Sequence, residues 1–210
     1  MVCYQDNEDG YTQLIRFSSG EHYEEIKEDL DNLIRLGIHL ESITTDGHKS
    51  ILKAIKNALP DVTVQRCLVH IQRMCLIWLT KYPKHIAGQE LRELVLLLLK
   101  IKTANDQLAW TRALEQWYQY HKDYLNEKTY QPETGRYWFT HKLLRRAYQT
   151  IKRALPNMFH YLNNPKIPST TNGIEGYFSH LKNHLDIHRG LSLKHRIDFI
   201  KWYVYLSNEK

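Results

Sequence analysis

Apolar and polar positions in the first third of the chain alternate between strand-like and helix-like periods. Residues 2–4 and 11–17 are β-prone on either side of a polar turn that ends in Gly10, which predicts a hairpin. Residues 18–21 then have the spacing of a capping box, and the amphipathic helix that follows is expected to end at Gly37. The chain therefore begins as two strands and a helix.

Residues 42–70 continue as strand, helix and strand. The first strand ends in Asp46, apolar residues at helical spacing follow, and Pro60 separates this helix from the next strand. A connection of this length suits a parallel pair with a right-handed crossover. Ligands of open α/β sheets bind beyond the carboxyl ends of the strands. We therefore expect Asp46, Cys67 and His70 to converge on one rim of a sheet.

Beyond residue 70 the period becomes helical. No strand pattern is visible, so we predict an all-helical insertion over residues 71–165, with a loop at 130–137 that contains proline and glycine. Its aromatic residues are expected in the core or on helix ridges rather than in a base-stacking platform. The predicted helices of this region cover residues 68–80, 89–102, 106–126 and 140–155.

The last part of the chain returns to the α/β body. A polar linker at 163–171 precedes a helix that starts at Asn172, and an aromatic-rich helix follows from Leu193. Together these elements predict the α/β class. Residues 1–70 and 166–210 are expected to form the main body, and residues 71–165 are expected to be inserted into it.

Composition and charge restrict the class of protein further. The 210 residues are 42% hydrophobic and 25% charged, which is ordinary for a globular protein, and the net charge of +6 is compatible with a polyanionic partner. The three cysteines are an odd number and cannot all pair in disulfide bonds, which suggests a reducing compartment. The longest apolar run, residues 94–99, is too short to cross a bilayer, and the start of the chain lacks a signal-peptide pattern. We expect a cytoplasmic protein with no membrane partner.

Two acidic residues are candidates for metal chemistry. Asp46 follows a strand and Glu175 lies in the first turn of a predicted helix. Each has an ordinary interpretation, as a turn residue or as compensation of the helix dipole. If the two converge at the sheet rim, they would form an oxygen-ligand site for Mg²⁺ or Mn²⁺, the ions that support phosphoryl transfer.

The Cys67-x-x-His70 motif leaves three alternatives open. It could be half of a zinc site, although no second closely spaced pair of ligands is present. It could be a Cys–His dyad, or simply a buried cysteine beside a hydrogen-bonded histidine. Basic residues around the last helices, including Lys182 and Arg189, form either a solvated face or a phosphate-contacting surface.

Three stretches carry a resemblance to a known family. They are TTDGHKSILKAI at 44–55, LPDVTVQRCLVHIQR at 59–73 and TTNGIEGYFSHLKNHLDIHRGLS at 170–192. In this order, and with a helical insertion between the second and the third, the chain resembles transposases of bacterial insertion sequences related to the Mutator group. The resemblance implies a DDE-type recombinase with a ribonuclease-H-like mixed sheet. Residues 1–70 and 166–210 would be its catalytic core.

The resemblance also implies roles for individual residues. Asp46 would be the second catalytic aspartate, Glu175 the catalytic glutamate, and His70 of the Cys67–His70 motif a neighbour of the scissile phosphate. Lys182 and Arg189 would contact DNA. The implied reaction, with Mg²⁺ or Mn²⁺ as cofactor, is hydrolysis at a transposon end followed by attack of the freed 3′-hydroxyl on target DNA. The implied setting is a nucleoid-associated homo-oligomer that holds transposon ends and target DNA.

One departure from the family pattern changes these expectations. The first catalytic aspartate of the family lies on a central strand upstream of the hairpin, whereas this sequence starts inside the hairpin. We therefore expect an N-terminally truncated transposase whose first central strand is missing, whose sheet is split in two, and whose strand-transfer activity is weak or absent. The alternatives are an inactive remnant that binds DNA or regulates a full-length transposase, and a zinc protein of unrelated function.

Overall fold

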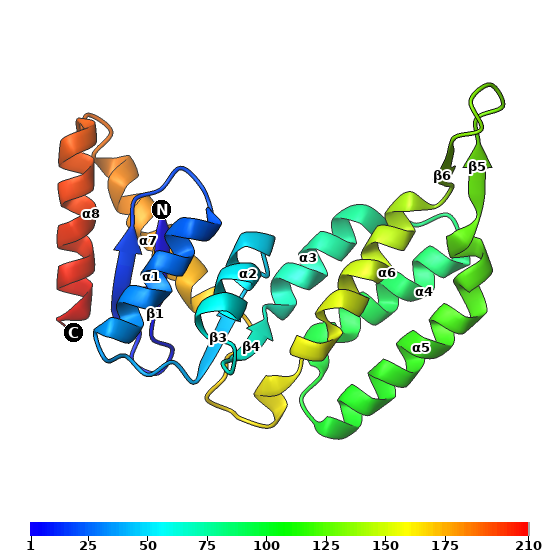
Figure 1. Ribbon diagram of the computed structural model, residues 1–210, viewed down its shortest axis with the longest axis horizontal. Helices are drawn as coiled ribbons and strands as arrows, with labels where there is room; N and C mark the ends of the chain where they lie inside the picture. Colours follow the sequence, from blue (N-terminus) through cyan, green and yellow to red (C-terminus); the bar gives the residue numbers. More distant parts are fainter. Residues whose placement is uncertain (210) are drawn as a thin grey trace. The chain divides into compact units, whose positions relative to one another are not determined.

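The computed structural model describes residues 1–209, and the chain divides into two compact units (Figure 1). Unit 1 contains residues 1–64 and the chain from Lys166 onward, and unit 2 contains residues 65–165. The architecture is mixed α/β, as expected. In the described residues the strands form three separate two-stranded sheets, which pair β1 with β2, β3 with β4, and β5 with β6.

Unit 1 begins with the predicted hairpin. Strands β1 (Val2–Gln5) and β2 (Thr12–Arg16) pair antiparallel, with Cys3 opposite Ile15. Gly10 closes the turn with φ of +73°, a conformation that glycine adopts without steric cost. The prediction of a hairpin at this place is confirmed.

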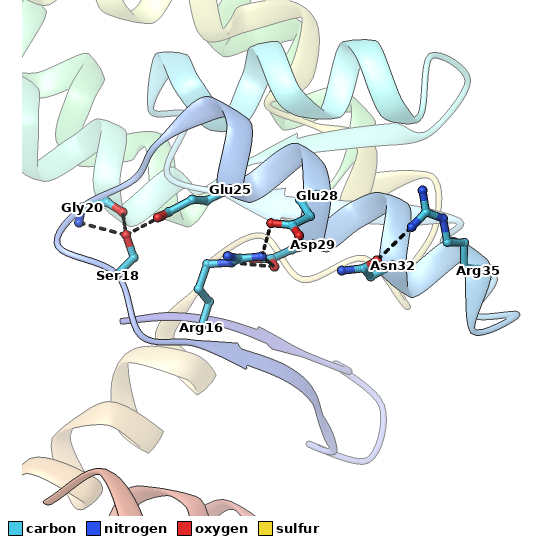
Figure 2. Close-up of polar contacts among 8 residues, drawn as sticks. All are labelled: Arg16, Ser18, Gly20, Glu25, Glu28, Asp29, Asn32 and Arg35. Carbon is cyan, nitrogen blue, oxygen red and sulfur yellow. Dashed lines mark hydrogen bonds and ion pairs between the residues drawn. The ribbon is translucent and has the colours of Figure 1, made fainter. Parts of the chain in front are cut away.

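Helix α1 (Tyr23–Arg35) starts later than the sequence suggested, and the predicted capping box is wrong. The N-cap is His22, which makes no side-chain cap. Ser18 lies too far upstream of the first turn to cap it. Its hydroxyl accepts a hydrogen bond from the backbone N–H of Gly20 and lies 2.5 Å from the carboxylate of Glu25 (Figure 2).

The following elements have the predicted order of strand, helix and strand. Strand β3 (Ser42–Thr45) leads into α2 (Lys49–Ala58), and β4 (Thr63–Arg66) pairs with β3. Helices α1 and α2 pack on each other and form the small apolar core of unit 1. Its fully buried members are Ile26, Leu30, Ala54 and Ile55.

Two C-terminal helices complete unit 1. They are α7 (Asn172–Ile187) and α8 (Leu193–Asn208), and they lie on the side of the hairpin opposite α1 (Figure 2). The carboxamide of Asn208 accepts a hydrogen bond from the Thr12 N–H at 2.9 Å and donates one to the Thr12 carbonyl at 3.0 Å. A side-chain amide thus pairs with the backbone of β2 as a neighbouring strand would.

Unit 2 is built mainly from helices around a large apolar core. Trp110 and Trp117 are buried in it, and their indole N–H groups donate to the carbonyls of Leu94 and Ala87. The expectation of core positions is confirmed for these two residues. The long helices of unit 2 are α3 (Leu68–Leu79), α4 (Ile86–Leu97), α5 (Ala104–Asn126) and α6 (Lys142–Ala154).

Unit 2 also contains a β-hairpin, so the prediction of a strand-free insertion is wrong. Strands β5 (Lys128–Tyr130) and β6 (Tyr137–Phe139) pair antiparallel, and the predicted loop forms the turn between them. Each strand has three residues, which is too short for a two-residue period to be recognised in the sequence. Their threonine, tyrosine, tryptophan and phenylalanine residues are nevertheless strand-prone types.

An ion pair connects the first hairpin to α1. The Arg16 guanidinium lies 2.6 Å from Oδ1 of Asp29 and 2.8 Å from the carboxylate of Glu28 (Figure 2). The Asp29 side chain is only 2% exposed. Its charge is therefore withdrawn from water, and Arg16 supplies the compensating charge. The hydrogen bond to Asp29 is the main cause that raises the pKa of Arg16.

We predict that Arg16→Met lowers the free energy of unfolding by about 3 kcal/mol, because it leaves the buried Asp29 carboxylate without its charge partner. Chemical denaturation of both proteins measures this loss. Glu28→Gln is the matched control, and we expect it to cost less than about 1 kcal/mol since Glu28 is exposed. Equal losses in the two variants would contradict a structural role for the Arg16–Asp29 pair.

Candidate functional site

Asp46 is held in a defined turn at the end of β3. Its Oδ1 accepts a hydrogen bond from the backbone N–H of His48 at 2.9 Å and lies 3.4 Å from the hydroxyl of Thr45. The N–H of Gly47 donates to the same Thr45 hydroxyl, and Gly47 has φ of +84°. The half-buried carboxylate is therefore oriented by the turn between β3 and α2.

Glu175 lies in the first turn of α7, as predicted. The hydroxyl of Thr171, the N-cap residue, donates to Oε1 of Glu175 at 3.3 Å. The carboxylate is half-buried and lies at the positive end of the helix dipole. Both candidate acids are thus oriented by threonine hydroxyl groups close to them in the sequence.

A hydrogen bond ties together the two stretches that carry these acids. Thr44 of β3 donates from Oγ1 to the carbonyl of Pro168 at 3.0 Å, in the segment that leads to α7. The same segment is fixed to the first hairpin, because Asn7 donates to the carbonyl of Lys166 and Glu8 pairs with its ammonium group. Unit 1 therefore fastens the chain before Glu175 against the strand that ends at Asp46.

The donor chemistry of Asp46 and Glu175 suits a hard divalent cation. Mg²⁺ is commonly bound through one or two carboxylates, with water and substrate phosphates as the other ligands. Within residues 1–209 no group of three or more histidine, cysteine, aspartate or glutamate side chains could hold a metal ion. The described side chains thus offer at most part of a ligand set, and a zinc site made of four protein ligands is not formed among them.

Cys67 and His70 belong to unit 2, at the start of α3. Cys67 is the N-cap residue and is fully buried, and His70 is half-buried within the first turn. Their predicted convergence with Asp46 on one rim stays a prediction. Lys182 on α7 and Arg189 just after it are both exposed, as a phosphate-contacting surface requires. Arg189 donates to the carbonyl of Asp186.

The threonines that orient the site were not predicted from the sequence. Thr44, Thr45 and Thr171 are ordinary residues when they are considered one at a time. The sequence nevertheless contains the related tetrapeptides TTDG at 44–47 and TTNG at 170–173. This repetition was the available signal, since each tetrapeptide precedes or contains one of the candidate acids.

Comparison with known proteins identifies a family. A family model described as "Transposase, Mutator family" matches residues 7–127, which is more than half of the chain. The matched region includes Asp46, Cys67 and His70, and it ends before Glu175. No curated protein and no solved structure matches the chain. Among the described residues, no helix has the length and apolar character needed to span a membrane.

We predict that the thiols of the folded protein resist alkylation. Burial raises the pKa of Cys75 to about 12, so at pH 8 its thiolate population is about a thousandfold smaller than that of an ordinary thiol. Cys67 is fully buried, and burial raises the pKa of Cys3 to about 11. Mass spectrometry after iodoacetamide treatment should show three modified cysteines only in denaturant. Rapid labelling of Cys67 in the folded chain would contradict this prediction and would support the interpretation of Cys67 and His70 as a reactive dyad.

Proposed function

This chain belongs to the Mutator family of transposases, and we propose that its unit 1 carries two carboxylates of a DDE-type phosphoryl-transfer site. The observation that supports this most directly is the hydrogen bond from Thr44 to Pro168. It joins the strand that ends at Asp46 to the segment that starts the helix of Glu175. A phosphoryl-transfer site needs carboxylates from separate elements held near each other, and this contact supplies such a connection.

The proposed reaction has two steps on DNA. Water first hydrolyses a phosphodiester bond at a transposon end, which breaks the P–O3′ bond and leaves a 3′-hydroxyl group. That hydroxyl then attacks a phosphodiester of the target strand, and the target's own 3′-oxygen leaves. Asp46 and Glu175 would hold Mg²⁺ or Mn²⁺, which when bound stabilises the charge on attacking and leaving oxygens.

The surrounding residues of unit 1 keep the two acids in place. The His48 N–H and the Thr45 hydroxyl orient Asp46, and the Thr171 hydroxyl orients Glu175. Preorganised ligands need no rearrangement when substrate arrives, and this lowers the cost of reaching the transition state. A role for His70 beside the scissile phosphate rests on the family resemblance.

DNA is the partner of this proposed activity. The net charge of +6 favours binding of a polyanion, and the exposed Lys182 and Arg189 would contact phosphates near the helix of Glu175. Transposon ends and target DNA would be held by a homo-oligomer, because the reaction joins separate DNA sites.

We predict that the chain binds Mn²⁺ with about micromolar affinity, and that Asp46→Asn and Glu175→Gln each abolish this binding because each removes a charged ligand. Isothermal calorimetry measures the binding, and thermal unfolding of each variant confirms that it is folded. Asp61→Asn changes an exposed acid outside the site and is the matched control.

Binding that survives both substitutions would contradict the proposed site. DNA affinity that is retained without any Mn²⁺ binding, and that falls steeply with salt, would instead favour a DNA-binding regulator that does not cleave.

A further inference from the structure

The β5–β6 hairpin of unit 2 presents aromatic rings to solvent. It projects beyond the ends of α5 and α6 (Figure 1). Tyr130 is paired with Tyr137, and Lys128 with Phe139. Paired residues of an antiparallel ladder point to the same face, so these four side chains form one surface, which we call the hairpin face. Its two tyrosines are 59% and 52% exposed, and their ring centroids lie 5.8 Å apart.

The base of this hairpin is firmly held. The Thr140 N–H donates to the Glu127 carbonyl at 2.9 Å, and the Glu127 carboxylate lies 2.7 Å from Nε2 of His141. The His141 ring also stacks on Tyr124 of α5, with 3.6 Å between the ring centroids. These contacts fix the points where both strands leave the helices. The aromatic rings are therefore displayed from a rigid support and lose little freedom when a ligand binds.

Positively charged side chains lie over two of the aromatic rings of the hairpin face. The Lys128 ammonium lies 4.1 Å from the centroid of the Tyr137 ring, and the Arg145 guanidinium lies 3.9 Å from that of Phe139. Between residues 128 and 153 the one acidic residue is Glu133. The basic residues of this stretch are Lys128, Arg136, Lys142, Arg145, Arg146, Lys152 and Arg153. Such a balance of charge complements a polyanion and opposes docking of a basic or neutral apolar partner.

We propose that the hairpin face binds unpaired nucleotides of DNA. Tyr130 and Tyr137 stack on bases, while Lys128, Arg136 and Arg145 contact the phosphates. The faces of bases within a duplex are covered by their neighbours, so this surface selects single-stranded segments over blunt duplex. The inference rests on the proposed function, because cleavage and joining of DNA expose strand ends whose terminal bases can leave the stack.

The inference is tested by replacing the tyrosine rings. The whole chain is titrated against a fluorescent single-stranded oligothymidine and against a blunt duplex, and anisotropy gives both affinities. We expect the double variant Tyr130→Leu/Tyr137→Leu to bind the single strand roughly tenfold or more weakly, because aromatic–base stacking is lost. Its affinity for duplex should change less than about twofold, because the phosphate contacts remain.

Two controls separate stacking from loss of structure. The double variant Tyr130→Phe/Tyr137→Phe keeps both rings and should bind the single strand as the unchanged protein does. Tyr82→Leu removes another exposed tyrosine of unit 2, one that is 79% exposed and has Lys81 over its ring, and it should have no effect. Thermal unfolding confirms that the leucine variants remain folded.

The outcomes distinguish this inference from the proposed function. If the unchanged protein binds both DNAs and the leucine double variant binds the single strand equally well, the hairpin inference is wrong and the proposed function stands. An equal loss for single strand and duplex would also overturn it, because that result reports charge rather than stacking. Failure of the unchanged protein to bind either DNA would overturn both.

Discussion

Unit 1 depends on the ion pair between Arg16 and the buried Asp29. A two-stranded hairpin is marginal on its own, and this contact holds the β1–β2 hairpin against α1. The turn of the same hairpin fixes the chain at Lys166 through Asn7 and Glu8. That segment leads directly to the helix of Glu175. A charge compensated inside the fold therefore supports, through the hairpin and its contacts with Lys166, the position of a candidate catalytic acid.

Disturbing the Arg16–Asp29 pair costs free energy of folding because buried polar groups surround it. The Tyr4 hydroxyl and Oδ2 of Asp29 are both buried, and the phenol interacts with the Asp29 carboxylate. Burial and then the negative charge of Asp29 raise the pKa of Tyr4, so the phenol stays neutral. Without Arg16 the Asp29 carboxylate would lose its charge partner while it stays withdrawn from water. The Arg16–Asp29 pair consequently contributes more to the free energy of unfolding than an exposed salt bridge would.

The sequence predicted elements well where the local pattern was long or the turn chemistry was specific. The β3–α2–β4 order followed from helical spacing between Asp46 and Pro60, and Gly10 and Gly37 take the positive φ angles that their turns require. The prediction of a capping box was wrong because residues 18–21 have the required spacing although no helix starts at Ser18. The Ser18 hydroxyl instead accepts a hydrogen bond from Gly20 in a bend before the helix. The β5–β6 hairpin was missed because three-residue strands carry no measurable period.

The acidic residues of the candidate site could be predicted from the sequence, but the contacts that arrange them in space could not. Asp46 and Glu175 could be identified from their places after a strand and at a helix start. The Thr171 hydroxyl orients the glutamate through a local contact within the first turn of α7. The Thr44 hydroxyl, in contrast, ties the two stretches together through a contact between residues 124 positions apart, which depends on tertiary structure. Sequence periodicity reports burial and carries no information about such hydrogen bonds.

The two units are stabilised by different interactions, and this difference affects how each could act on DNA. Unit 2 has a large apolar core with buried tryptophans, so it can carry an exposed aromatic hairpin without losing its fold. Unit 1 has a small core and relies on polar contacts, so we expect the position of its two candidate acids to be sensitive to single substitutions such as Arg16→Met. A loss of metal binding after such a change would accompany a loss of stability. Replacement of Tyr130 and Tyr137, by contrast, should alter DNA affinity while the free energy of unfolding stays the same.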